Sequence, residues 1–196
     1  MGRMNATPSP TPTETAAPAE KPAEVKSQAR FLVPLLIVCA LGALFWPKEP
    51  GRAAPGGKVE DRDGGRFELE DRYRQVTLVH FWATWCPPCR DEMPKLQKFS
   101  QELAGRPEFA LVMVAVADDR KKALAFIGAD QPGAVATTYF DDDWKVSKSW
   151  GSDKLPETHL VVNGQVLFTY IGAQNWDDPA IRAKVEAALA GKAKAS

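Results

Sequence analysis

Two cysteines separated by two residues form the segment of this 196-residue chain most able to do chemistry, Trp85-Cys86-Pro87-Pro88-Cys89. The segment follows an apolar run over residues 76–82 and opens a stretch with helical periodicity. A strand that leads into a helix here places the first thiol at a helix N-terminus, where unpaired N–H groups and the helix dipole favour an anion. The thiolate is the reactive form of cysteine, and one helical turn brings the second thiol within reach of a disulfide. The motif therefore predicts thiol–disulfide redox chemistry at Cys86 and Cys89.

Two other uses of a Cys-x-x-Cys pair fit this sequence less well. A structural zinc ion needs about four ligands, and the remaining candidates are Cys39, which lies in an apolar segment, His80 and His159. A purely structural disulfide across so short a loop constrains little of the unfolded chain. Three cysteines are also too few for a disulfide-stapled scaffold. Redox chemistry is favoured, with no metal and no cofactor expected.

The bulk composition allows one domain of ordinary size plus additional segments, because 44% of the residues are hydrophobic. The chain carries 25 basic and 25 acidic residues, and neither half contains a basic block. Nucleic acid is therefore not an expected partner.

The first 46 residues differ from the rest of the chain. Residues 1–30 are rich in proline and nearly free of large apolar side chains, which predicts a disordered tail. Residues 31–46 contain no charge, and this run is slightly shorter than the roughly 20 residues of a transmembrane helix, a difference that snorkelling flanks or bilayer thinning can absorb. Lys26 and Arg30 precede it, so the positive-inside rule predicts a cytoplasmic tail, a single membrane anchor and an extracytoplasmic, periplasmic domain.

A cleaved signal peptide is the competing interpretation of residues 31–46, and the thirty-residue leader argues against it. Either way the domain is exported. A lipoprotein site at Cys39 is weaker still, because Val38 is bulky where such sites have a small residue, and Cys39 is expected to fill the apolar helix. Residues 47–58, with three prolines and a Gly-Gly pair, predict a linker.

From residue 59 the pattern is that of a globular α/β domain extending to residue 196. Residues 66–70 alternate like a half-buried strand, residues 76–82 and 109–116 read as buried strands, and residues 88–104 read as a helix with apolar side chains on one face and a kink at Pro94. A strand, helix, strand order of this length implies a right-handed parallel crossover.

The second half of the domain continues this pattern. Short helices are expected over residues 121–128 and 143–150, a short strand over residues 137–140, and a closing helix over residues 179–190. Asn163-Gly164 between two apolar runs, residues 158–162 and 166–170, predicts an antiparallel hairpin. The expected fold is a central mixed β-sheet with helices on both faces.

With residues 81–89 reading Phe-Trp-Ala-Thr-Trp-Cys-Pro-Pro-Cys, the chain resembles the thioredoxin superfamily. Glu92-Met93-Pro94, the inserted helix and strand after Val116, the run Leu155-Pro156-Glu157-Thr158 and the N-terminal anchor are similar to its TlpA/ResA branch of membrane-anchored, extracytoplasmic thiol-disulfide oxidoreductases. The resemblance covers about residues 59 to 190 and implies a thioredoxin-like fold.

The resemblance also implies roles for residues around the cysteines. The family's proline at the position of Pro156 is cis and packs beside the disulfide, and Leu155 would then offer its backbone to an extended substrate. Trp85 would shield the site and contact the partner. The plainer alternatives are an ordinary proline at a strand start and a tryptophan used for packing. Cys86, the more exposed thiol, is expected to form the mixed disulfide, and Cys89 to resolve it.

Glu92 lies three residues after Cys89, one helical turn along. The family has a functional glutamate at this position, and a carboxylate in a partly apolar place has a raised pKa and can exchange protons with a thiol. The alternative is a solvated acid like Asp91.

His80 departs from the family, in which thioredoxins carry a buried aspartate at this position and this branch commonly carries asparagine. A neutral histidine there either takes a proton-relay role or is a core residue hydrogen-bonded to the backbone. His159 is expected to be a satisfied strand residue.

The Pro87-Pro88 dipeptide bears on the direction of the reaction. Prolines remove two N–H groups that could stabilise a Cys86 thiolate, which predicts a reductase whose Cys86 pKa is not strongly depressed. A membrane thiol carrier would supply electrons, and the resemblance implies substrates among exported proteins with oxidised cysteine pairs, such as cytochrome c apoproteins or copper-site proteins. A disulfide-donating oxidase and a copper chaperone using Cys86, Cys89 and His159 remain alternatives.

Overall fold

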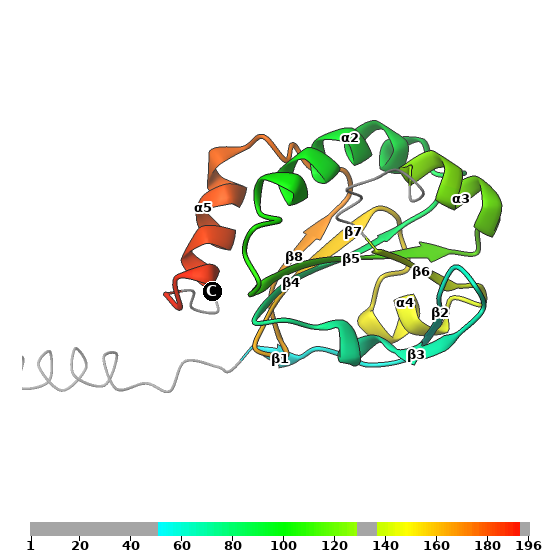
Figure 1. The fold of residues 1–196 in the computed structure, drawn as a ribbon, viewed down its shortest axis with the longest axis horizontal. Helices are drawn as coiled ribbons and strands as arrows, with labels where there is room; N and C mark the ends of the chain where they lie inside the picture. Colours follow the sequence, from blue (N-terminus) through cyan, green and yellow to red (C-terminus); the bar gives the residue numbers. More distant parts are fainter. Residues whose placement is uncertain (1–50, 129–136, 193–196) are drawn as a thin grey trace, which may run out of the picture. The chain divides into compact units, whose positions relative to one another are not determined.

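The computed structural model describes residues 51–128 and 137–192, whose strands form one eight-stranded sheet in the order β1-β8-β7-β4-β5-β6-β2-β3 (Figure 1). The strands are β1 (Arg52–Ala53), β2 (Lys58–Glu60), β3 (Arg66–Glu68), β4 (Val76–Trp82), β5 (Phe109–Val116), β6 (Thr137–Asp141), β7 (Glu157–Val162) and β8 (Gln165–Ile171). The helices are the 3-10 helix η1 (Leu69–Arg72) and the α-helices α2 (Pro87–Glu102), α3 (Arg120–Ile127), α4 (Lys145–Trp150) and α5 (Pro179–Leu189).

The centre of the sheet is mixed, as the sequence predicts. β4 is buried along its whole length, pairs parallel with β5 and antiparallel with β7, and β5 pairs parallel with β6. β7 and β8 form the expected antiparallel hairpin, in which Asn163 and Gly164 both adopt positive φ angles of 50° and 75°. Such angles suit the two central residues of a tight hairpin turn.

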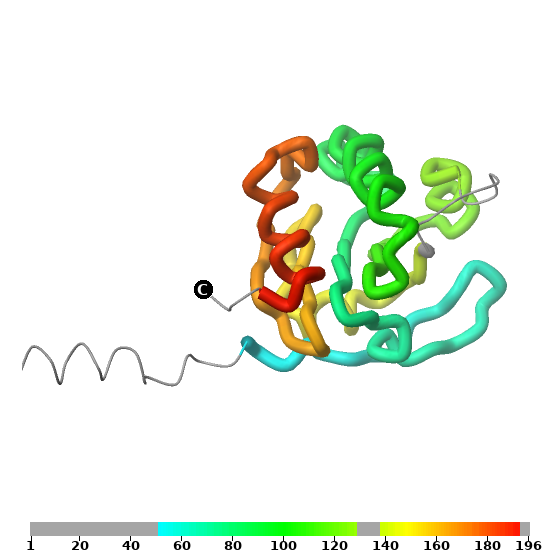
Figure 2. Tube along the Cα trace, turned by 60° about the vertical axis from the view of Figure 1, so that its left-hand side comes forward, coloured from blue at the N-terminus to red at the C-terminus, as the bar shows by residue number. Residues whose placement is uncertain are grey.

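Helices cover both faces of this sheet, and Figures 1 and 2 show α2, α3 and α5 together on one side. The larger apolar cluster joins these three helices to β4 and β5, and it contains the four apolar residues of the predicted helix face, Met93, Leu96, Phe99 and Leu103. On the other face α4 contributes Val146 and Trp150 to a second cluster. The predicted α/β architecture with helices on both faces is confirmed. α2 continues through Pro94 as one helix.

The structure differs from the sequence-based expectation near the start of the domain. The strand expected over residues 66–70 ends at Glu68, because Leu69 turns into the core as the first residue of η1 and donates its N–H to the Gly57 carbonyl. The predicted linker over residues 47–58 includes β1, which pairs with β8, and the first residue of β2. The sheet thus begins earlier than residue 59.

Several segments singled out in the sequence lie outside the described residues. They include the predicted tail over residues 1–30, the predicted anchor over residues 31–46 with Cys39, and the last four residues. Among residues 51–128 and 137–192, no helix combines the length and apolarity needed to cross a membrane.

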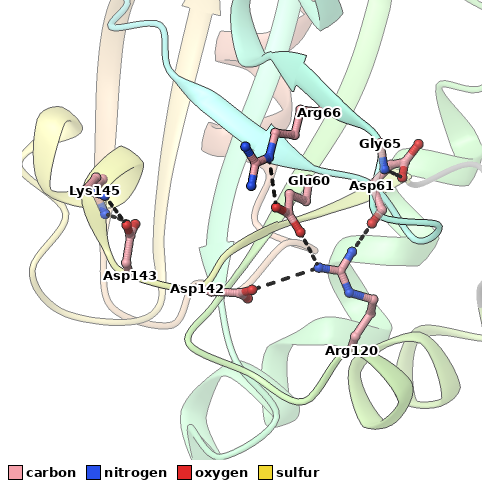
Figure 3. Close-up of polar contacts among 8 residues, drawn as sticks. All are labelled: Glu60, Asp61, Gly65, Arg66, Arg120, Asp142, Asp143 and Lys145. Atoms are coloured by element: carbon pink, nitrogen blue, oxygen red, sulfur yellow. Dashed lines mark hydrogen bonds and ion pairs between the residues drawn. The ribbon is translucent and has the colours of Figure 1, made fainter.

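Arg120 joins three separate segments at the far end of the sheet (Figure 3). Its Nη2 atom lies 2.9 Å from Glu60 Oε2 and 3.9 Å from Asp142 Oδ2, and its Nη1 atom donates to the Asp61 carbonyl. The guanidinium also stacks 4.3 Å above the Phe140 ring. One partly buried side chain therefore ties the start of α3 to the β2–β3 hairpin and to the turn after β6.

Candidate active site

The two cysteines of the motif form a disulfide at the N-terminus of α2. Cys86 is the N-cap residue, Cys89 lies in the first turn, and their Cα atoms are 5.3 Å apart. Both are buried: Cys86 is 4% exposed and Cys89 is fully covered. The preceding strand β4 ends at Trp82, so the chain leaves the sheet just before the disulfide. The dipole of α2 acts on the first sulfur.

The donors around the first sulfur are few. Pro87 and Pro88 occupy the first two positions of α2 and carry no N–H group. The N–H of Cys89 points at Cys86 Sγ across 3.4 Å, and the N–H of Arg90 donates to the Cys86 carbonyl at 3.2 Å. Among the first four positions of the helix, one N–H group thus faces the sulfur.

The loop before the disulfide is fastened to the chain that follows β5. The backbone N–H and the hydroxyl of Thr84 donate to the two carboxylate oxygens of Asp118, across 2.5 and 2.6 Å. The indole N–H of Trp85 donates to the Ala117 carbonyl at 3.0 Å. Trp85 remains 51% exposed, with its ring centroid 6.1 Å from that of Trp144. This aromatic surface lies directly beside the disulfide in sequence and stays open to a partner.

The peptide bond between Leu155 and Pro156 is cis, which confirms the expectation for this proline. Pro156 immediately precedes β7, whose first residue, Glu157, pairs with Phe81 near the end of β4. The start of β7 and the end of β4 share one edge of the sheet, so the proline lies at the edge from which Cys86 emerges. Leu155 is half-buried against the apolar cluster that contains both cysteines.

Glu92 is buried, which excludes the interpretation of a solvated helix acid like the exposed Asp91. Its Oε2 atom accepts hydrogen bonds from the backbone N–H of Gln174 at 2.7 Å and from the indole N–H of Trp176 at 2.9 Å. Burial raises the pKa of Glu92 to about 6, although these two donors act to lower it. The side chain can therefore gain or lose a proton near neutral pH.

His80 is fully buried on β4 and bonds to a side chain rather than to the backbone. Its Nδ1 atom lies 2.8 Å from Thr158 Oγ1, and its Nε2 atom lies 3.8 Å from Glu92 Oε1. Burial lowers the pKa of His80 to about 3, so the imidazole is neutral at physiological pH and the contact with Glu92 is not an ion pair.

His159 lies on the opposite face of the sheet from the disulfide. Its ring packs against Phe81 and Trp150, with centroids 5.9 and 4.8 Å away, in the cluster under α4. Its Nδ1 atom contacts the Thr169 hydroxyl, and its Nε2 atom lies 2.8 Å from the Ser152 hydroxyl and 3.0 Å from Glu157 Oε1. Cys86 and Cys89 belong to the other cluster. The copper-chaperone alternative is therefore wrong in its ligand set, because the sheet separates the histidine from the two sulfurs.

Three residues of this region were not found by sequence reasoning. Trp176 and Gln174 hold Glu92 from more than 80 positions away, and no local pattern announces them. Asp118 had a usable signal, since it follows a buried strand parallel to β4 and must emerge at the same edge of the sheet.

Comparison with known proteins agrees with this geometry. The sequence model of the Redoxin family matches residues 49–189. The thiol-disulfide oxidoreductase ResA of Bacillus subtilis (strain 168) is 30% identical over 135 residues, which cover 65% of this chain and 74% of that protein. The thiol:disulfide interchange protein DsbE of Escherichia coli (strain K12) is 29% identical over 171 residues, 76% of this chain and 89% of that protein.

A comparison with solved structures also finds proteins of the same fold. The structure of MTB DsbF, in mixed oxidised and reduced forms, superposes with a TM-score of 0.56 at 26% identity, covering 67% of this chain and 94% of that one. The disulfide at the start of α2, the cis-proline and the mixed sheet are thus set in a fold shared with these proteins. The chain belongs to the Redoxin family and is a thioredoxin-like thiol-disulfide oxidoreductase of the ResA/DsbE type.

Proposed function

We propose that this protein is a membrane-anchored, extracytoplasmic reductase of disulfides in exported proteins. The observation that supports reduction over oxidation is the small number of hydrogen-bond donors at Cys86. At the start of α2, the Cys89 N–H is the helix N–H group that faces the sulfur. A thiolate with few donors is poorly stabilised, so the dithiol gives up its electrons readily. The alternative is a disulfide-donating oxidase, which shares every motif and differs in reduction potential.

The reaction starts from the reduced pair. The Cys86 thiolate attacks one sulfur of the target disulfide, which breaks the target's S–S bond, forms a mixed disulfide and releases one target thiolate. Glu92 in its ionised form takes the proton of the Cys89 thiol, three residues before it on the same helix. The Cys89 thiolate then attacks Cys86 Sγ, which forms the Cys86–Cys89 disulfide and releases the second target thiolate. Glu92 afterwards gives its proton to that thiolate or to solvent.

The target chain is proposed to lie across Trp85, Leu155 and Pro156. Trp85 offers a half-exposed indole ring, and its N–H is already satisfied by Ala117, so burying the ring under a partner leaves no donor unpaired. The residues before β7 offer backbone to an extended substrate segment. Such a surface suits an unfolded or flexible cysteine pair, as in an apocytochrome c or a copper-site protein.

The proposed location rests on the sequence of residues 31–46, an uncharged apolar run preceded by Lys26 and Arg30. An extracytoplasmic reductase consumes two electrons in each cycle, and the oxidised Cys86–Cys89 pair must be reduced again. A membrane thiol carrier that exchanges its dithiol with this disulfide would supply them.

The deciding experiment is the equilibrium reduction potential of the Cys86–Cys89 pair in the purified full chain, titrated against glutathione and dithiothreitol. A value near or below that of thioredoxin, about −270 mV, supports the reductase. A value near the strongly oxidising end, about −120 mV, overturns it in favour of the disulfide donor. A Cys89→Ser variant, which lacks the resolving thiol, should accumulate mixed disulfides with its targets and allow their identification by mass spectrometry.

A further inference from the structure

Two buried polar atoms beside the active-site helix face each other without any hydrogen-bond partner. Within the described part of the chain, Glu92 Oε1 and His80 Nε2 are both among the buried side-chain atoms left unpaired. They lie 3.8 Å apart, and their side chains are 3% and 0% exposed. A buried polar atom without a partner is costly, and here two such atoms from α2 and β4 are directed at each other.

The other oxygen of Glu92 determines where its proton sits. Oε2 accepts from the Gln174 N–H and the Trp176 indole N–H, and neither group can accept a hydrogen bond in return. A proton on Glu92 therefore belongs on Oε1, facing His80 Nε2.

The other nitrogen of His80 can form a hydrogen bond with Thr158 both when Glu92 is protonated and when it is ionised. Nδ1 lies 2.8 Å from the hydroxyl of Thr158, which can donate or accept. When Glu92 is protonated, its O–H points at a bare Nε2, and Nδ1–H donates to Thr158. When Glu92 is ionised, Nε2–H points at Oε1, and Nδ1 accepts from Thr158. The imidazole is neutral in both arrangements, which agrees with the burial that lowers its pKa to about 3.

We propose that His80 and Glu92 form a hydrogen-bonded pair in which the His80 imidazole changes tautomer whenever Glu92 gains or loses its proton. The 3.8 Å gap closes to a usual hydrogen bond with a movement of about 0.9 Å. His80 is then a positioning residue, because it supplies Oε1 with a donor in one state and an acceptor in the other. This inference rests on the proposed role of Glu92 as the group that exchanges protons with Cys89.

The other charged and titratable groups around Glu92 do not reach Oε1. On α2, Asp91 and Lys95 are exposed, and Lys95 pairs with Asp177 from the segment before α5 at 3.3 Å, as does Lys98 at 3.5 Å. Tyr170 of β8 packs its ring on Trp176, with centroids 6.0 Å apart. Glu157 and His159 flank Thr158 on β7 and point to the opposite face of the sheet. Cys89 is held in the disulfide in the oxidised protein and does not titrate there.

The oxidised full chain is the right sample, because the disulfide keeps Cys86 and Cys89 out of the titration. With ¹⁵N-labelled histidine and ¹³C-labelled glutamate carboxyl groups, NMR from pH 4.5 to 8 reports the His80 tautomer and the Glu92 charge in the same protein. We expect His80 to change from Nδ1–H to Nε2–H with the midpoint at which Glu92 ionises. A single His80 tautomer throughout the Glu92 titration overturns the proposal.

Two variants test the same pair. His80→Leu removes both donor and acceptor, and we expect about tenfold stronger proton binding at Glu92, because an ionised carboxylate loses more from a missing donor than a protonated acid loses from a missing acceptor. His80→Gln retains an amide donor and acceptor and should restore the Glu92 titration close to that of the unaltered protein. His159→Gln changes the buried histidine on the other face and should leave the Glu92 titration as it was.

An unchanged Glu92 titration in a folded His80→Leu protein overturns the proposal. If His80→Leu does not fold, the tautomer measurement on the unaltered chain decides by itself. The measurement involves no turnover, so it is independent of the reduction potential: an oxidising potential would defeat the proposed reductase and leave the His80–Glu92 result standing.

Discussion

The indole N–H of Trp176 donates a 2.9 Å hydrogen bond to Oε2 of Glu92, and so joins the segment before α5 to the helix that carries both cysteines. Trp176 is itself buried, with its ring against Phe99 and Tyr170. A carboxylate held by two N–H donors in an apolar place is stabilised in its ionised form against the effect of burial. Burial and the two hydrogen bonds therefore act on the pKa of Glu92 in opposite directions.

Trp176→Phe removes one donor to the carboxylate and retains most of the apolar ring. The ionised form of Glu92 loses a charge-assisted hydrogen bond, so its pKa, already raised to about 6, should rise further, with about tenfold stronger proton binding. The pH at which the Cys89 thiol becomes reactive in the mixed disulfide should move upward accordingly, as followed by the pH dependence of target release. Gln174→Ala is the matched control, because the hydrogen bond there comes from the backbone N–H. Equal effects of the two substitutions would contradict this account.

Trp85→Ala tests the proposed docking surface. The half-exposed indole ring lies next to Cys86 and is expected to be covered by a bound protein target. Loss of a large aromatic contact should lower kcat/KM for a protein disulfide about tenfold, about 1.4 kcal/mol. Reaction with a small disulfide such as oxidised glutathione should change far less, because it covers little of the ring. Parallel losses with both substrates would show that Trp85 acts on the cysteines instead.

Arg120→Ala should destabilise the fold more than Arg66→Ala, although both arginines bind Glu60 (Figure 3). Arg120 is partly buried and also contacts the Asp61 carbonyl and the Phe140 ring, so we expect a loss of about 1–2 kcal/mol in the free energy of unfolding. Arg66 is largely exposed, and its pair should contribute less than about 0.5 kcal/mol. Urea denaturation of the three proteins measures both values. A larger loss for Arg66→Ala would show that the contacts of Arg120 contribute less to stability than the pair of Arg66 and Glu60 within the β2–β3 hairpin.

Lowering the pH should reduce the free energy of unfolding, because His159 binds a proton more readily in the unfolded chain than in the folded one. Burial, and secondarily the positive charge of Arg52, lowers the pKa of His159 to about 4. Between this value and the ordinary histidine pKa of about 6.5, the unfolded chain binds a proton that the folded chain excludes, so stability is full above about pH 6.5 and falls as pH drops toward 4. The loss is on the order of 3 kcal/mol for this one group.

Comparison with His159→Gln measures that contribution together with any change at Glu157, whose Oε1 atom lies 3.0 Å from His159 Nε2. Glu92 acts in the opposite sense, because its raised pKa makes the folded chain bind more protons between about 4.5 and 6, and it does so in both proteins. The difference in unfolding free energy between the two proteins, measured by urea denaturation from pH 4 to 7.5, should therefore change with pH as His159 titrates. A difference that stays constant with pH would show that His159 is not excluded from protonation in the folded state.

Local patterns in the sequence were enough to predict the architecture and the reactive pair. The alternation of apolar residues, the Asn163-Gly164 turn and the spacing of Cys86 and Cys89 depend on neighbours a few positions apart, and the structure has the corresponding strands, hairpin and disulfide. The chemistry of a Cys-x-x-Cys at a helix start is equally local. The mixed sheet followed from crossover rules that need only the order of elements.

Only the tertiary structure decided what surrounds the reactive pair. Glu92 accepts hydrogen bonds from residues 174 and 176, and His80 bonds to Thr158. Strand β1 pairs with β8. The two histidines look alike in sequence, yet the sheet places His80 beside the active-site helix and His159 on the far face. The physical reason is that these contacts join segments distant along the chain, and burial, which sets the pKa of each group, is a property of the packed core and not of the local sequence.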